Sequence, residues 1–207
     1  TSGNTTITAL SEADNWLVSG TFNHNNGTVV FGSAAASYIT TSGNHFWNVV
    51  LTGAYLKDNI FVDNNLDKTS GGIIWSWGSW YRNITVANIT TIYAGRISSR
   101  TSDPTYSIGT LNTTTLVVNS AGVYDAALVT YVNGTTTVNG CIIFASGVNY
   151  TANGAVTINS GGAFGNNTNY NLAMNTFTIN SGGILNAPNG TGTMTVTPTQ
   201  STTVMVT

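Results

Sequence analysis

The sequence predicts an all-β protein: a right-handed parallel β-helix (β-solenoid) with coils of about 20 residues, occupying residues 1–207 as a single domain. Three observations support this prediction. A turn motif recurs at nearly constant spacing, and apolar residues alternate with Thr between the turns. Only 6% of residues are charged, against about 25% in ordinary soluble domains. The polar share is instead Thr, which favours strands, and Asn, Ser and Gly, which favour turns.

The turn motif is Asn-Ser-Gly-Gly or a close variant, and its period is the strongest signal in the chain. Its first residues are Asn119, Asn139, Asn159 and Asn180, at spacings of 20, 20 and 21 residues. The pairs at 133–134 and 153–154, both Asn-Gly, form a second series with the same period. A constant period of this length indicates stacked repeats, because one coil cannot bury its own apolar face but stacked coils share a core.

The segments between these turns read as strands. Apolar residues alternate with Thr at 156–158 and 177–179, and a period of two places one face inside. Residues 111–207 are therefore predicted to form regular coils. The same period appears earlier, at 29–31 and 49–51. Further strands are expected at 60–62, 73–75, 84–86, 89–93 and 108–111.

Two segments depart from the regular pattern. Residues 11–16 are the only helix-like piece, and residues 1–20 are a candidate cap for the open end of the stack. Residues 57–110 are expected to carry longer loops and an aromatic, charged face, since 57–103 holds nine of the twelve charged side chains. The period is weak before residue 110, so a β-sandwich remains an alternative there. Residues 126–207 contain no charged side chain.

The charge balance excludes one class of partner and favours another. Net charge is −2, and no Lys/Arg cluster is present to bind phosphates, so nucleic acid is not an expected partner. No run of 18 apolar residues is present, so no membrane insertion is expected. A surface without like-charge repulsion tends to self-associate, so the expected partner is a second copy of the chain.

Nine Asn-X-Ser/Thr triplets are candidate N-glycosylation sites. They begin at Asn4, Asn26, Asn83, Asn88, Asn112, Asn133, Asn149, Asn166 and Asn189. A chain rich in Asn and Thr also produces such triplets by chance. Attached glycans would supply hydration that the missing charges do not. The chain begins at Thr1 rather than Met, which fits a mature protein after processing or an expressed fragment, so secretion has to be argued from other features.

The single cysteine, Cys141, cannot form an intramolecular disulfide. It is either a small buried side chain or the site of an intermolecular disulfide between subunits. In the repeat alignment it takes the turn position of Ala121, Gly161 and Gly182. Because the corners of a solenoid face outward, the alignment predicts a thiol that a neighbouring subunit can reach.

Four aromatic residues within seven positions form the second candidate site: Trp75, Trp77, Trp80 and Tyr81. Trp75 and Trp77 have strand spacing and would point the same way. Exposed aromatic side chains bind sugar faces and form hot spots between proteins. A buried core filled by Trp is the third interpretation.

No assembled enzyme site is recognised, and no catalytic residue, metal site or cofactor is assigned. His24 and His45 lie 21 residues apart and are interpreted as surface or ladder residues; the nearest acids in sequence are Glu12, Asp14 and Asp58. The enzymatic alternative is polysaccharide cleavage, with Asp58, Asp63 and Asp67 as carboxylates. Residues 63–67 also resemble the start of a Ca²⁺ loop, but lack its Gly at the sixth and Glu at the twelfth place.

The segments 20–31 (Gly-Thr-Phe-Asn-His-Asn-Asn-Gly-Thr-Val-Val-Phe) and 46–51 (Phe-Trp-Asn-Val-Val-Leu) resemble a repeat of large prokaryotic surface proteins. This match covers about a sixth of the chain. The remainder is similar to the Thr/Asn/Gly-rich β-helices of bacterial and archaeal adhesins and sheath-forming proteins. The resemblance implies an extracellular structural or adhesive role, and it brings no catalytic residues with it.

The sequence therefore favours an extracellular, cell-surface structural protein that self-assembles into a filament, sheath or coat. An adhesin or phage-fibre module that binds glycans is the first alternative. A polysaccharide-cleaving β-helix is the second.

Overall fold

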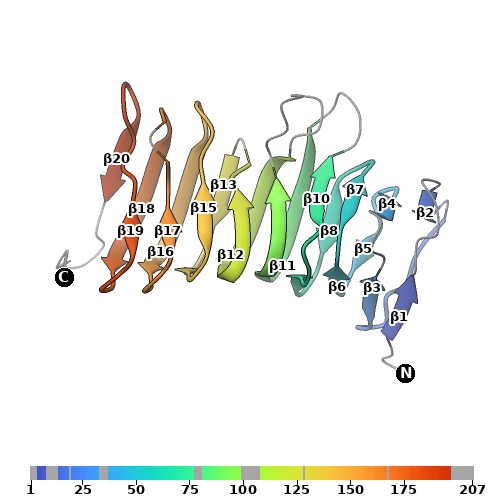
Figure 1. The fold of residues 1–207 in the computed structure, drawn as a ribbon. Helices are drawn as coiled ribbons and strands as arrows, with labels where there is room; N and C mark the ends of the chain where they lie inside the picture. The colour runs from blue at the N-terminus through green and yellow to red at the C-terminus, as the bar shows by residue number, and fades with distance from the viewer. Residues whose placement is uncertain are drawn as a thin grey trace.

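The computed structural model describes residues 4–7, 14–18, 20–32, 37–76, 81–98, 108–127, 129–166 and 168–196. All regular structure in these segments is β-strand, and every strand pairing is parallel. The strands stack into a rod with the two chain termini at opposite ends (Figure 1). The predicted β-solenoid is confirmed, with about eight turns of about 21 residues.

The strands lie on three faces. The first face holds β1 (Asn4–Ile7), β3 (Thr28–Phe31), β6 (Asn48–Leu51), β9 (Leu66–Lys68) and β14 (Thr136–Val138). The second holds β2 (Asp14–Leu17), β4 (Ser37–Thr40), β7 (Ala54–Leu56), β10 (Ile73–Ser76), β15 (Cys141–Ile143), β17 (Ala163–Phe164) and β19 (Ile184–Leu185). The third holds β5 (His45–Phe46), β8 (Ile60–Val62), β13 (Val129–Val132) and β20 (Thr193–Val196).

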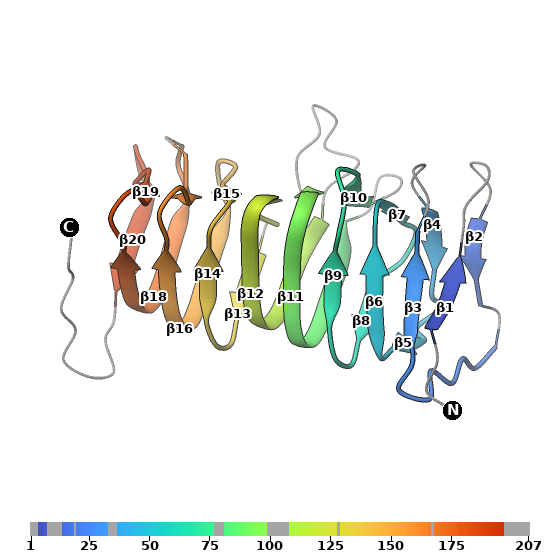
Figure 2. The same ribbon diagram turned by 60° about the horizontal axis from the view of Figure 1, so that its bottom comes forward.

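Four longer strands bend around the corners between faces. β11 (Arg82–Ser98) and β12 (Ile108–Asp125) run through all three faces, and β16 (Asn149–Ile158) and β18 (Asn171–Ile179) run through the third and the first. Along the first face, β3, β6 and β9 lie side by side, nearer to the N-terminal end of the rod than β14 (Figure 2). The described residues before 110, where the period is weak, thus belong to the same solenoid and not to a β-sandwich.

The register explains which coils were visible in the sequence. Leu116 pairs with Thr136, and Thr136 pairs with Val156, so each step is 20 residues as predicted. Ile97 pairs with Tyr124, which is a step of 27 residues. The longer step agrees with extra residues between these coils, and residues 77–80 and 99–107, within the segment where longer loops are expected, lie outside the described residues.

The core fills the inside of the coils. Val156 and Ile158 are buried while Thr157 between them is partly exposed, as the alternation predicts. Phe144 and Tyr170 stack inside with ring centroids 4.5 Å apart. The buried hydroxyl of Tyr150 bonds that of Thr136 at 2.6 Å, so this polar group keeps a partner away from water.

The helix-like reading of residues 11–16 is wrong where the structure describes it. Residues 14–17 form strand β2, which pairs with β4. Trp16 packs against Phe22 (5.1 Å) and Phe46 (5.4 Å), and this apolar contact outweighs the weak helical preference of so short a segment. The suggested capping role of residues 1–20 remains a prediction.

The Gly positions of the corners follow from close stacking. A Cβ on Gly140 would lie 2.2 Å from the carbonyl oxygen of Asn119 in the coil before it, a distance that no side chain tolerates. Gly161 and Gly182 have φ values of 80° and 82°, which L side chains rarely adopt.

Among the described residues, no helix is long and apolar enough to span a membrane.

Candidate functional site

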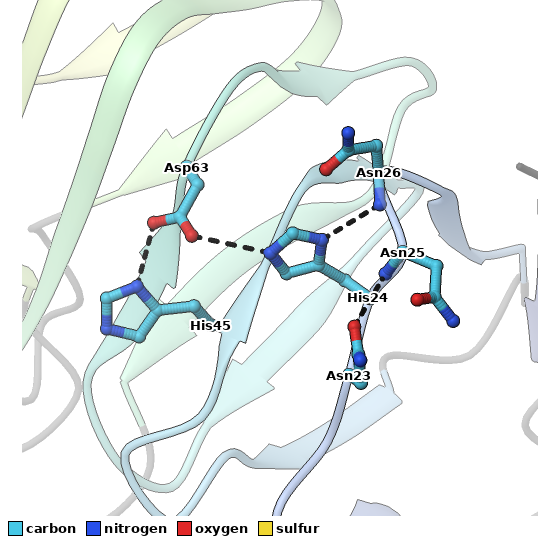
Figure 3. A network of polar contacts seen from close by, with 6 residues as sticks. All are labelled: Asn23, His24, Asn25, Asn26, His45 and Asp63. Carbon is cyan, nitrogen blue, oxygen red and sulfur yellow. Dashed lines mark hydrogen bonds and ion pairs between the residues drawn. The ribbon is translucent and has the colours of Figure 1, made fainter.

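A carboxylate held between two imidazoles forms a polar cluster on the exterior of the rod (Figure 3). Asp63, which directly follows β8, has its Oδ1 2.7 Å from Nδ1 of His45 and its Oδ2 3.5 Å from Nε2 of His24. The three residues belong to three consecutive passes of the chain. The cluster therefore ties neighbouring coils together at the corner between the third and first faces.

The turn that presents His24 is built by its asparagines. Asn25 and Asn26 have φ values of 45° and 55°, a region in which Asn is enriched among non-Gly residues. The backbone N–H of Asn25 donates to Oδ1 of Asn23 at 3.1 Å, and that of Asn26 donates to Nδ1 of His24 at 3.0 Å. Nδ1 is thus an acceptor, so the proton of a neutral His24 lies on Nε2, which faces Asp63.

Each imidazole also stacks on an aromatic ring. His45 lies on Phe61 with centroids 5.0 Å apart, and His24 lies on Trp47 at 5.7 Å. The side chain of His45 is half exposed. When its Nδ1 donates to Asp63, its Nε2 is left as an acceptor for an external donor.

The acids nearest to the two histidines in sequence are Glu12, Asp14 and Asp58, but the acid that contacts both imidazoles is Asp63, which lies farther along the chain. Each imidazole contacts a different oxygen of the Asp63 carboxylate, so this carboxylate bridges the two histidines. In the described residues, no group of three or more His, Cys, Asp or Glu side chains is arranged to hold a metal ion.

The three carboxylates considered for polysaccharide cleavage have different partners. Asp58 accepts the backbone N–H groups of Thr41 (2.8 Å) and Ser42 (2.6 Å), and so fixes a turn. Asp67 lies on the first face, where burial raises its pKa and a hydrogen bond from Thr91 opposes the rise. The side chain of Asn64 donates to Asn48 and accepts from Asn88, and the side chain of Asn65 accepts from Asn88, so both amides belong to a ladder between coils.

The predicted aromatic group is only partly described, because Trp77 and Trp80 lie outside the described residues. Tyr81 is exposed just before β11. Trp75 lies on the second face and packs edge-on against Tyr55 at 5.4 Å, while Tyr55 stacks on Tyr38 at 4.9 Å. Sequence reasoning missed both tyrosines, although they precede Trp75 by one and two coils in the ladder.

Cys141 is the first residue of β15, paired with Val123 and Ala163, and not a turn residue. The alignment erred because the turn before it is Asn-Gly, shorter than the Asn-Ser-Gly-Gly of the later coils, so the strand starts earlier. The thiol is half buried, and burial, followed by the charge of Asp125, raises its pKa. A raised pKa lowers the thiolate fraction, which is the reactive form.

Asp125 is the last charged residue of the chain and is almost completely buried. It accepts hydrogen bonds from Nη2 of Arg96 at 2.7 Å and from the hydroxyl of Ser98 at 2.8 Å. The hydrogen bond to Asp125 raises the pKa of Arg96 above its ordinary value. This ion pair is therefore part of the packing between two coils.

The asparagines of the candidate glycosylation triplets are unevenly distributed over the faces and corners of the solenoid. Asn83, Asn112 and Asn149 lie in third-face strand segments, and Asn88 and Asn133 at the corner that leads to the first face. Asn166 and Asn189 lie in the connections from the second face to the third. Asn26 is exposed before β3, and Asn4 begins β1.

No family model matches this chain, and no curated protein and no solved structure does.

Proposed function

We propose that this chain is an extracellular structural protein that associates with copies of itself into a filament, sheath or coat of a prokaryotic cell surface. The observation that carries the proposal is the uncharged second half of the rod. Beyond the buried Asp125, no charged side chain follows in the sequence, while the coils continue through β20. An exterior of Thr, Asn and Ser without net repulsion favours contact between like surfaces.

The ladders of identical side chains support the same proposal. Asn159 donates to Asn139 and Asn180 donates to Asn159, both at 2.7 Å, so amides run continuously along the stack. Repeated, flat side-chain ladders of this kind pack well against one another. A rod made of such coils is a spacer or a building block, and its regularity serves assembly better than it serves a reaction centre.

Sedimentation velocity over a hundredfold range of protein concentration tests the proposal. We expect the average mass to grow with concentration and to change little between low and high salt, because the contacts are not charge pairs. A single monomeric species at every concentration would contradict it. Cys141, which lies in β15 on the second face, is proposed to add a separate link between copies through an intermolecular disulfide, and unchanged assembly in reductant would refute that part alone.

An extracellular location is proposed from the glycosylation triplets. The side chains of Asn26, Asn88, Asn133 and Asn149 are exposed, as an attached glycan requires. The intact mass of protein isolated from its native cell surface, before and after glycan release, tests occupancy. An unmodified mass would contradict glycosylation.

Glycan binding is the second candidate, and the row of Tyr38, Tyr55 and Trp75 favours it. Tyr55 and Trp75 are partly exposed, and aromatic faces bind sugar rings. Lys57 lies over the Tyr38 ring, 5.2 Å from its centroid, and adds a hydrogen-bond donor beside the row. Oligosaccharide titration followed by tryptophan fluorescence, with Trp75→Ala as the comparison, would show whether this row binds sugar.

A further inference from the structure

We infer that the first face, from Thr91 in β11 to Asn180 after β18, is the surface through which one copy of this protein packs laterally against another. This inference rests on the proposed self-association and adds the surface that mediates it. A row of small outward side chains crosses this face in unbroken register. It consists of Val117, Thr137, Thr157 and Thr178, and it begins beside Thr91, which is only 8% exposed.

The face is flat and uniform along this row. Leu116 to Val118, Thr136 to Val138 and Val156 to Ile158 pair without a bulge. Each of the last three threonines in the row is followed, two residues later, by an asparagine of the amide ladder. These asparagines are Asn139, Asn159 and Asn180. Thr and Val are short and β-branched, so the surface has no long side chain that must be ordered before a partner can approach.

The face carries no charge over these coils. The coil before Thr91 carries a charged side chain in the same row, Asp67 of β9, which accepts a hydrogen bond from Thr91. Arg82 and Arg96 lie on the third-face and second-face segments of β11. A charged polymer therefore finds no counter-charge here, whereas a second uncharged face of the same kind meets no repulsion.

The glycosylation triplets leave this face clear. From residue 81 onward they lie on the third face or at its two corners. None begins within the first-face segments 89–92, 115–119, 136–139, 155–159 or 176–180. Because a glycan is bulky and hydrated, a rod with glycans at these sites can pack closely only through a surface without them.

The size of the face decides what kind of assembly it supports. Five coils at about 4.8 Å and strands of about five residues at about 3.3 Å give roughly 400 Å² per partner. A stable pair buries about 800 Å² per partner. One pair of faces is therefore too small for a stable isolated dimer, so pairing through this face is weak and contributes to an assembly beside other contacts.

Two matched double variants test the assignment. Thr157→Lys with Thr178→Lys places two charges on the first face. Ala173→Lys with Thr195→Lys places two charges on the third face, in register with each other, and leaves every Asn-X-Ser/Thr triplet intact. All four positions point outward, and thermal melting followed by circular dichroism checks that both proteins keep the fold; the single Thr157→Lys variant substitutes if the first pair does not.

We expect the third-face variant to sediment like the wild type. The first-face variant should need at least a tenfold higher concentration to associate. Wild-type-like association of the first-face variant would overturn the assignment while leaving self-association intact. Equal dispersal of both variants would also overturn it, because added charge alone would then explain the effect. A wild type that stays monomeric would remove the proposed function itself.

Discussion

Replacing Lys68 with Met should change how the stability of the protein depends on pH. Lys68 points into the core from β9, in register with Leu51 and Ile92, and is fully buried. Its amine donates to the backbone carbonyls of Ser70 and Ala94. Burial lowers its pKa from 10.5 to about 8. Folding therefore favours the neutral amine.

The direction and size follow from proton linkage. Between pH 8 and 10.5 the unfolded chain binds more protons at this site than the folded chain, so stability rises with pH through that window. At 1.36 kcal/mol per pKa unit, the lowered pKa of Lys68 reduces the free energy of unfolding by about 3 kcal/mol at pH 7. About 2 kcal/mol of it disappears by pH 9.5.

Urea unfolding followed by tryptophan fluorescence measures this at pH 7 and pH 9.5. The free energy of unfolding of the wild type, minus that of Lys68→Met, should rise by about 2 kcal/mol between the two pH values. Buried tyrosines such as Tyr124 and Tyr150 and the thiol of Cys141 also have raised pKa values, but they titrate in both proteins and cancel. A difference that stays constant, or falls, would refute the reasoning.

Three further outcomes are expected. Asp63→Asn should destabilise the protein by no more than about 1 kcal/mol, because the contacts of this carboxylate with His24 and His45 lie on the partly exposed exterior; a larger loss of stability in thermal melting would contradict this. Phe164→Ala removes a buried ring and should cost about 3–5 kcal/mol in urea unfolding, whereas Ile184→Ala at an exposed position should change less than about 1 kcal/mol. The thiol of Cys141 should react with a disulfide reagent at pH 8 more slowly than in urea, and equal rates would show that it is not shielded.

The coils were predictable where the period is constant. At 137–139 and 157–159 the strand alternation and the Asn turn agree, and the observed register of Thr137 with Thr157 follows directly. Earlier coils differ in length, since Val49 pairs with Leu66 and Leu66 with Thr90. Steps of 17 and 24 residues blur the repeat, although each strand still shows its own alternation.

The candidate site was harder to predict for the same reason. Asp63 meets His24 and His45 because three coils of unequal length bring their corners together, and a fixed 20-residue period does not align them. Lys68 reads as a surface charge in sequence, since nothing local shows that it lies on the inner side of a three-residue strand. Strand position in a short coil is set by the neighbouring coils, through ladder pairing and burial.

Negative-stain electron microscopy of the purified protein at neutral pH, without reductant, tests the central claim most directly. Eight coils at about 4.8 Å make a rod about 40 Å long. The account predicts ordered filaments, hoops or sheets in which such rods lie side by side. A field of uniform, separate particles of the size of one rod, at all protein concentrations, would contradict self-assembly.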